Sequence, residues 1–200
     1  MIFIAHRRNT LDKLIQTDTK YGVEVDIRSY KNDLVIHHDP FQPGENFEKW
    51  LGFFKHKTLI LNIKEEGLEQ RILNLMKKYN IEDFFFLDQS FPFLVKWAKA
   101  GEKRSAVRVS EFESIKTALS LSERISWVWL DCFNKFPINK KEFDKLKKAD
   151  FKICLVSPEL QGREPNEEIS LFSDIIQKDK LLIDAICTKR IDLWEANLNL

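Results

Sequence analysis

Two carboxylates and a histidine pair form the part of the chain best suited to chemistry. In residues 22–30 apolar side chains alternate with charged ones, so Glu24, Asp26 and Arg28 share one side of an extended strand. Two acids spaced in this way point in the same direction and can hold one divalent cation through their oxygens. The histidines at 37–38 follow shortly afterwards and can supply acid–base chemistry beside such a cation.

The same residues also have plain structural explanations. Glu24 and Asp26 can serve only as ion-pair partners of Arg7, Arg28 or Lys64, and this alternative stays open. Alternation along residues 34–38 places the two histidines on opposite sides of the chain. We therefore expect the second histidine of the pair to act in chemistry and the first to support it.

The elements that must position these side chains are short apolar runs separated by helical patterns. We expect extended segments at 2–6, 22–30, 34–38, 58–64, 84–88, 106–109, 127–132, 151–156 and 183–187. We expect helices at 10–21, 68–79, 91–100, 111–123, 139–149 and 167–178, a short one within 39–57 and a last one from 191. The first helix should bury Leu11, Leu14 and Ile15.

This alternation predicts about eight parallel strands covered by helices. Polar residues follow nearly every expected strand, and no glycine-rich phosphate loop follows the first. A barrel requires polar residues at all its strand ends, because its active site is assembled from them. We predict an α/β fold in which residues 1–200 form one domain, a compact closed (β/α)8 TIM barrel with shortened or missing helices.

Composition excludes several classes of protein. The 200 residues are 44% hydrophobic, and the formal net charge is +1, which gives no basic surface for nucleic acid or for an anionic membrane. Three widely spaced cysteines, Cys132, Cys154 and Cys187, lie in apolar runs and indicate buried thiols in a reducing compartment. The N-terminus lacks a signal-peptide pattern, and no apolar run approaches a membrane span. We predict a cytoplasmic location.

Several short motifs together resemble the signature of the glycerophosphodiester phosphodiesterase family. They are His6-Arg7, Glu24-Val25-Asp26 and His38-Asp39, in the family's order and spacing, with Asn62-Ile63-Lys64 where the family carries Glu-x-Lys. Residues 184–188 are similar to the family's last strand. The resemblance is dense over residues 1–64 and faint beyond them.

The resemblance implies a phosphodiester hydrolase that uses a divalent cation, Mg2+ or Ca2+. It assigns the cation to Glu24 and Asp26, with Asn62 in place of the third acidic ligand. It makes His6 and His38 the general acid and base. A phosphodiester gains negative charge in the transition state, and Arg7 and Lys64 can neutralise that charge.

The chain also departs from the family pattern. Arg8 replaces the glycine after His-Arg, Asn62 brings no charge, and the insertion after His-Asp shrinks to about 39–57. Because the residues expected to bind the substrate differ from the family pattern, we expect a small soluble phosphodiester other than the family's usual substrate. It should be larger than that substrate or linked to a sugar or polyol. We expect its contacts to come from Ser157, Gln161, Arg163 and Lys189, and we leave Asp88, Asp131 and Glu159 open as further contacts.

Three functions remain open at this point. The leading one is metal-dependent hydrolysis of a phosphodiester. The second is a lyase that stops at a cyclic phosphate. The third is a barrel that has lost catalysis and binds an anionic metabolite or a protein partner.

Overall fold

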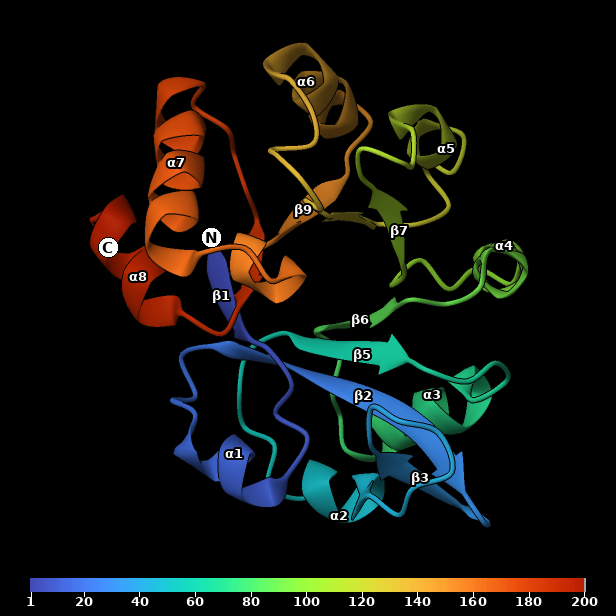
Figure 1. The fold of residues 1–200 in the computed structure, drawn as a ribbon. Coiled ribbons are helices and arrows are strands. Elements are labelled where there is room, and N and C mark those ends of the chain that lie inside the picture. The colour runs from blue at the N-terminus through green and yellow to red at the C-terminus, as the bar shows by residue number, and fades with distance from the viewer. Residues whose placement is uncertain (200) are drawn as a thin grey trace. The chain divides into compact units, whose positions relative to one another are not determined.

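The computed structural model describes residues 1–199 and shows a mixed α/β fold (Figure 1). The chain divides into two compact units. We call residues 4–105 the N-terminal unit, and residues 1–3 together with those from 106 onward the C-terminal unit.

A parallel sheet extended by a hairpin forms the centre of the N-terminal unit. Strand β2 pairs in parallel with Ile4 and Ala5 of β1 and with β5, and β5 pairs in parallel with β6. The second half of β2 pairs with β3 in antiparallel fashion, and β3 pairs with the very short β4. The strands are β1 (Ile2–Ala5), β2 (Gly22–Tyr30), β3 (Asp33–Ile36), β4 (Glu45–Asn46), β5 (Leu59–Ile63) and β6 (Phe84–Leu87).

The helices of this unit are short. They are α1 (Leu11–Gln16), α2 (Phe47–Leu51), α3 (Glu69–Lys78) and α4 (Phe91–Lys99). The Thr10 side chain caps α1, which ends at Gln16, earlier than the pattern predicts. So short a helix presents a single apolar residue to the core, and Leu14 takes that place. The prediction that Ile15 is buried is wrong, because its side chain faces solvent.

The C-terminal unit contains four parallel strands in the order in which they follow along the chain. They are β7 (Ala106–Val109), β8 (Trp127–Leu130), β9 (Lys152–Val156) and β10 (Ala185–Thr188). Its helices are α5 (Ile115–Leu119), α6 (Lys140–Lys148), a 3-10 turn η1 (Pro158–Gln161), α7 (Pro165–Lys178) and α8 (Ile191–Leu198). The lysine-rich α6 is amphipathic as expected, with Phe143 and Leu146 buried and the Asn139–Glu142 capping box at its start.

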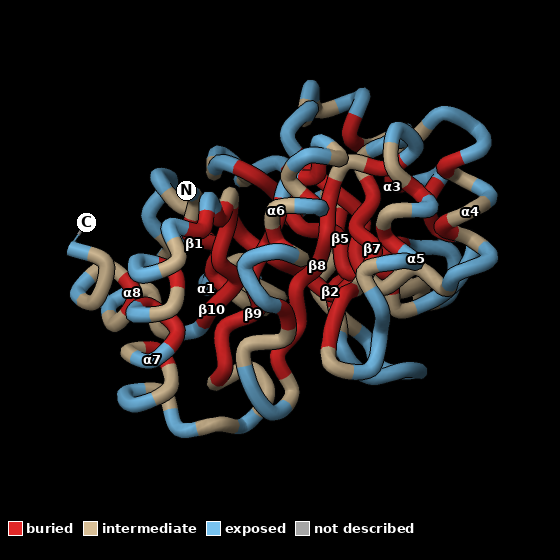
Figure 2. The backbone as a smooth tube through the Cα atoms, turned by 90° about the horizontal axis from the view of Figure 1, so that it is seen from above, coloured by how far each residue is buried: buried red, intermediate tan, exposed pale blue. Residues whose placement is uncertain are grey.

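Burial follows the strands in each unit, while the outer turns of the helices and the loops are exposed (Figure 2). Among the described residues, eight strands lie in parallel ladders, four in each unit when β1 is counted with the first. The α/β class and the strand–helix alternation are confirmed. Closure into one barrel and the single domain stay predictions.

Two further expectations can be compared with the structure. Cys132, Cys154 and Cys187 are free and buried, as their apolar surroundings predict, and burial raises the pKa of the Cys132 and Cys154 thiols. Over residues 1–199, no helix is both long and apolar enough to cross a membrane.

Candidate active site

Glu24 and Asp26 lie on β2, and both are completely buried. The apolar residues that alternate with them, Val23, Val25 and Ile27, are buried as well, so both faces of this strand are covered. A buried carboxylate needs hydrogen bonds or a positive charge close by, and the neighbouring elements supply both.

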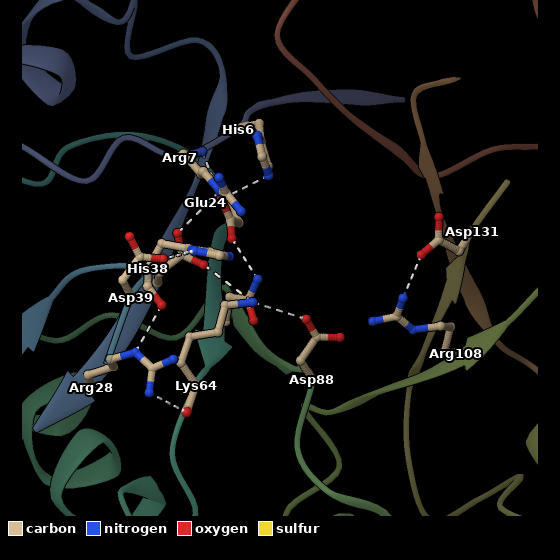
Figure 3. Close-up of polar contacts among 12 residues, drawn as sticks. His6, Arg7, Glu24, Arg28, His38, Asp39, Lys64, Asp88, Arg108 and Asp131 are labelled. Atoms are coloured by element: carbon tan, nitrogen blue, oxygen red, sulfur yellow. Dashed lines mark hydrogen bonds and ion pairs between the residues drawn. The ribbon is translucent and has the colours of Figure 1, made fainter. Parts of the chain in front are cut away.

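Glu24 is held by two hydrogen bonds at its carboxylate and by a histidine nearby (Figure 3). The Arg7 backbone N–H donates to Oε2 at 2.7 Å, and the Asn62 Nδ2 donates to Oε1 at 2.9 Å. The His6 Nε2 lies 3.8 Å from Oε2. Arg7 has a left-handed φ of 51°, an unfavourable conformation for a non-glycine residue, and its N–H faces Glu24 in this conformation.

Asp26 is held by Asn9 and by two cationic side chains. The Asn9 Nδ2 donates to Oδ2 at 2.7 Å, while the Asn9 Oδ1 accepts from the Asp26 backbone N–H at 3.1 Å. The Arg7 Nε lies 3.4 Å from Oδ2, and the Lys64 Nζ lies 3.4 Å from Oδ1. Lys64 also lies 3.3 Å from Asp88 Oδ2, so it links β2 to the end of β6 (Figure 3).

The two acids differ in their electrostatic surroundings. Burial, together with the charge of Asp26, raises the pKa of Glu24 to about 7. The ion pairs of Arg7 and Lys64 are made with Asp26 rather than with Glu24. Glu24 is therefore the group whose charge gains most from an additional positive charge in the site.

His38 stands at the end of the hairpin and is fixed by its neighbour. Its Nδ1 lies 2.8 Å from Asp39 Oδ1, and this contact lowers the pKa of Asp39. The His37 backbone N–H donates to the Asp26 backbone oxygen, and its ring Nδ1 accepts from the Asp39 N–H. His37 thus makes local backbone contacts, and His38 is half-exposed with its ring beside the Asp39 carboxylate. That His38 rather than His37 acts in chemistry stays a prediction.

Arg28 connects the backbone that follows β3 with the backbone that follows β5. Its Nε donates to the His38 backbone oxygen at 2.9 Å, and its Nη1 donates to the Lys64 backbone oxygen at 2.8 Å. One side chain on β2 therefore fixes the backbone that carries the histidine and the backbone that carries the lysine (Figure 3).

The donors that surround Glu24 fit a hard cation in type. Glu24, Asp26 and Asn62 all offer oxygen, and the buried Asn62 Oδ1 has no hydrogen-bond partner within residues 1–199. In the same range no group of three His, Cys, Asp or Glu side chains is arranged to hold a metal. A cation here would thus have two carboxylates and one neutral amide oxygen as its protein ligands.

The expected substrate contacts lie in the C-terminal unit and are engaged with other groups. Ser157 is buried, donates to Glu159 and accepts from the Trp194 Nε1. The Gln161 Nε2 donates to Asp131 Oδ1 at 2.7 Å. The remaining two differ in exposure: Arg163 pairs with Glu168 and lies over the Phe172 ring, whereas Lys189 is exposed and bonds Glu159 through its backbone N–H.

Two residues that contact the site, Asn9 and Arg28, were not predicted from the sequence to act in its chemistry. Asn9 makes two hydrogen bonds with Asp26, and its position two residues after the His6-Arg7 pair was the available indication of its place. Arg28 shares the strand face of Glu24 and Asp26, and this period-two signal was the available indication of its place.

Comparison with known proteins gives structural neighbours only. No family model and no curated protein matches this chain. The crystal structure of a glycerophosphodiester phosphodiesterase from Agrobacterium tumefaciens has a TM-score of 0.64 at 12% identity, covering 98% of this chain and 99% of that one. A glycerophosphoryl diester phosphodiesterase from Parabacteroides distasonis has a TM-score of 0.67 at 12% identity, covering 99% and 86%.

A third neighbour has a different name. A mutant tryptophan synthase alpha-subunit from Pyrococcus furiosus has a TM-score of 0.56 at 11% identity, covering 100% of this chain and 94% of that one. At such identities the similarity shows a shared fold and leaves activity to be argued from the site.

Proposed function

We propose that this protein is a metal-dependent phosphodiesterase that hydrolyses a small soluble phosphodiester, such as a sugar- or polyol-linked one. The observation that carries the proposal is the contact network of His6, Arg7, Glu24, Asp26 and Lys64. It unites an imidazole, two cationic side chains and two buried carboxylates within the N-terminal unit. The fold shared with two phosphodiesterases agrees with this chemistry.

Each side chain then has a defined task. Arg7 and Lys64 bind the phosphate and oppose the negative charge that grows in the transition state. His6 and His38 divide proton removal from the attacking hydroxyl and proton delivery to the leaving alkoxide. The contact with Asp39 at Nδ1 fixes the His38 ring, and this leaves Nε2 as its reacting nitrogen.

Glu24, Asp26 and Asn62 are the proposed ligands of a divalent cation, Mg2+ or Ca2+. Such an ion, when bound, would add positive charge beside the phosphate. Of the contacts expected in the C-terminal unit, we propose the exposed Lys189 as a substrate-binding residue, because Ser157 is buried, Gln161 is engaged by Asp131 and Arg163 is engaged by Glu168.

The direct test measures hydrolysis of bis(p-nitrophenyl) phosphate with Mg2+, Ca2+ or Mn2+. We expect turnover that EDTA removes and that His38→Ala lowers by at least about a hundredfold. His56→Gln is the matched control, because His56 bonds the Thr17 backbone oxygen outside the site and should keep wild-type rates.

Other outcomes separate the competing functions. Absence of turnover with every metal contradicts the proposal and favours a binding protein. A cyclic phosphate as the final product in phosphorus NMR, with a substrate that carries a neighbouring hydroxyl, favours the lyase.

We also propose that the parallel strands complete a closed (β/α)8 barrel. In support, Ser105, which immediately precedes β7, forms a parallel bridge with Phe86 of β6. A cytoplasmic location is proposed on the three free, buried thiols, which suit a reducing compartment.

A further inference from the structure

A cavity of about 500 Å3 lies within the N-terminal unit, beside residues 37–41 that follow β3 and include His38, which we call the catalytic loop. Its walls are the end of β2 and the turn that follows it, the residues after Asp39, and Glu65. The size is within the range of small-molecule sites. The residues that line it do not include those proposed to act on the phosphate.

Phe41 is the unusual residue of this cavity. Its side chain is 93% exposed, so a large apolar ring is left in water. Its φ of 60° lies in the left-handed region, which is unfavourable for a bulky residue. Phe41 therefore offers an uncovered aromatic surface among the residues that line the cavity.

The other walls show what kind of group fits. Tyr30 and Pro40 add flat apolar surface. The Lys31 Nζ lies over one face of the Tyr30 ring, 5.6 Å from its centre, and brings a positive charge to the cavity wall. Glu65 accepts both the backbone N–H and the hydroxyl of Ser29, so its carboxylate is engaged with the protein. A planar aromatic ring attached to an anionic group matches these walls.

The cavity is joined to the proposed catalytic groups through Arg28. This residue lines the cavity, and its guanidinium donates to the backbone oxygens of His38 and Lys64. Pro40 and Phe41 follow the His38-Asp39 pair directly in the chain. An alcohol group on a phosphate held at His38 and Lys64 therefore has this cavity beside it.

We propose that this cavity binds an aromatic, nucleoside-like alcohol group of the phosphodiester substrate, with its ring stacked on Phe41 and Tyr30. The inference rests on the proposed function and names one of the two alcohols on the phosphate. Stacking on an aromatic side chain tolerates many planar rings, so the class of group is set more firmly than its identity.

The test compares two diesters that differ in one alcohol: the methyl ester of adenosine 5′-phosphate and the methyl ester of glycerol phosphate. We expect kcat/KM for the adenosine diester to exceed that for the glycerol diester by at least about tenfold in the wild-type protein. Phe41→Ala should remove this preference, and Phe41→Tyr should retain it. Phe53→Ala is the control, since Phe53 is another exposed ring that does not line the cavity.

The results separate this inference from the function on which it rests. A wild-type protein without preference, or Phe41→Ala rates that fall equally for both diesters, overturns the aromatic subsite and leaves the phosphodiesterase intact. If neither diester is hydrolysed, the proposed function fails, and titration with adenosine 5′-phosphate followed by NMR decides on the subsite. Binding weakened at least about fivefold by Phe41→Ala supports it, and absent or unaltered binding overturns it.

Discussion

Asn62 is the residue in which the site departs most from a carboxylate-rich metal centre. Its amide donates to Glu24 at 2.9 Å, a contact that an ionised carboxylate at this position could not make. The same side chain presents the buried oxygen that we propose as a cation ligand. Asn62 thus limits repulsion between acids when no cation is bound, while it contributes no charge when one is.

Asn62→Asp tests this balance. The added carboxylate should raise affinity for Mg2+ or Ca2+ at least about tenfold, because ligand charge strengthens oxygen sites for hard cations. Without metal it should lower the free energy of unfolding by about 3 kcal/mol, because the Glu24 hydrogen bond is lost and a third buried negative charge is added. Calorimetric titration and urea unfolding in EDTA measure the two effects.

The exposed Asn74 on α3 provides the control for this substitution. Asn74→Asp adds the same charge in solvent and should change neither quantity measurably. Equal metal affinity of Asn62→Asp and the wild-type protein would remove Asn62 from the proposed ligands.

At the scale of elements, the hairpin of β2 and β3 positions the catalytic loop. Residues 34–36 were correctly expected to be extended, whereas His37 and His38 lie beyond the end of β3. The direction of β3 was not predicted, because apolar alternation is the same in parallel and antiparallel strands. The contacts of β2 with residues far away in the sequence were not predicted either. Asn9 reaches Asp26 from 17 residues away, a distance at which local patterns give no information. The lengths of α1 and α5 depend on packing rather than on propensity, and this explains why both are shorter than predicted.

Arg28 offers a test of the hairpin as a positioning element. Arg28→Met keeps the apolar stem but removes both hydrogen bonds to the His38 and Lys64 backbones. We expect kcat for bis(p-nitrophenyl) phosphate to fall at least about tenfold with KM changed less than twofold, because a displaced His38 loses its alignment for proton transfer. Steady-state kinetics give the split between kcat and KM, and hydrogen exchange at Asp39 reports the freed loop.

Arg71→Met is the matched variant, because Arg71 lies on α3 and its side chain contacts the same hairpin. The Arg71 guanidinium donates to one backbone oxygen, that of Asn32 in the hairpin turn. The Arg71→Met protein should therefore lose some stability and keep the wild-type kcat. If both variants lowered kcat to the same extent, the effect of Arg28 would be general destabilisation rather than positioning.

For the molecule as a whole, residue patterns predicted the α/β class and the alternation of strands with helices. Those features follow from local alternation and from the repeated strand–helix order. Both patterns can be read from short stretches of the sequence. Closure of a barrel depends on strand tilt and register over the whole sheet, and no local pattern encodes these. Arg7 and Lys64 were named from the sequence as possible ion-pair partners of the two acids, and both pair with Asp26, whereas the hydrogen bonds from Asn9 and Asn62 were not predicted.

Burial of Glu24 predicts how the stability of the metal-free protein depends on pH. The pKa of this group rises from 4.5 in the unfolded chain to about 7 in the folded protein, through burial and the charge of Asp26. The folded state therefore holds the proton more tightly. The resulting stabilisation is complete below pH 4.5, declines as pH rises and is lost above pH 7, and it amounts to about 3 kcal/mol. Urea unfolding in EDTA across this range measures it.

Glu24→Gln should abolish this part of the pH dependence, whereas Glu82→Gln, an exposed substitution, should keep the wild-type profile. If the Glu24→Gln protein kept an unaltered profile, another group would cause this pH dependence. The pKa of Glu24 in the folded protein would then not be raised.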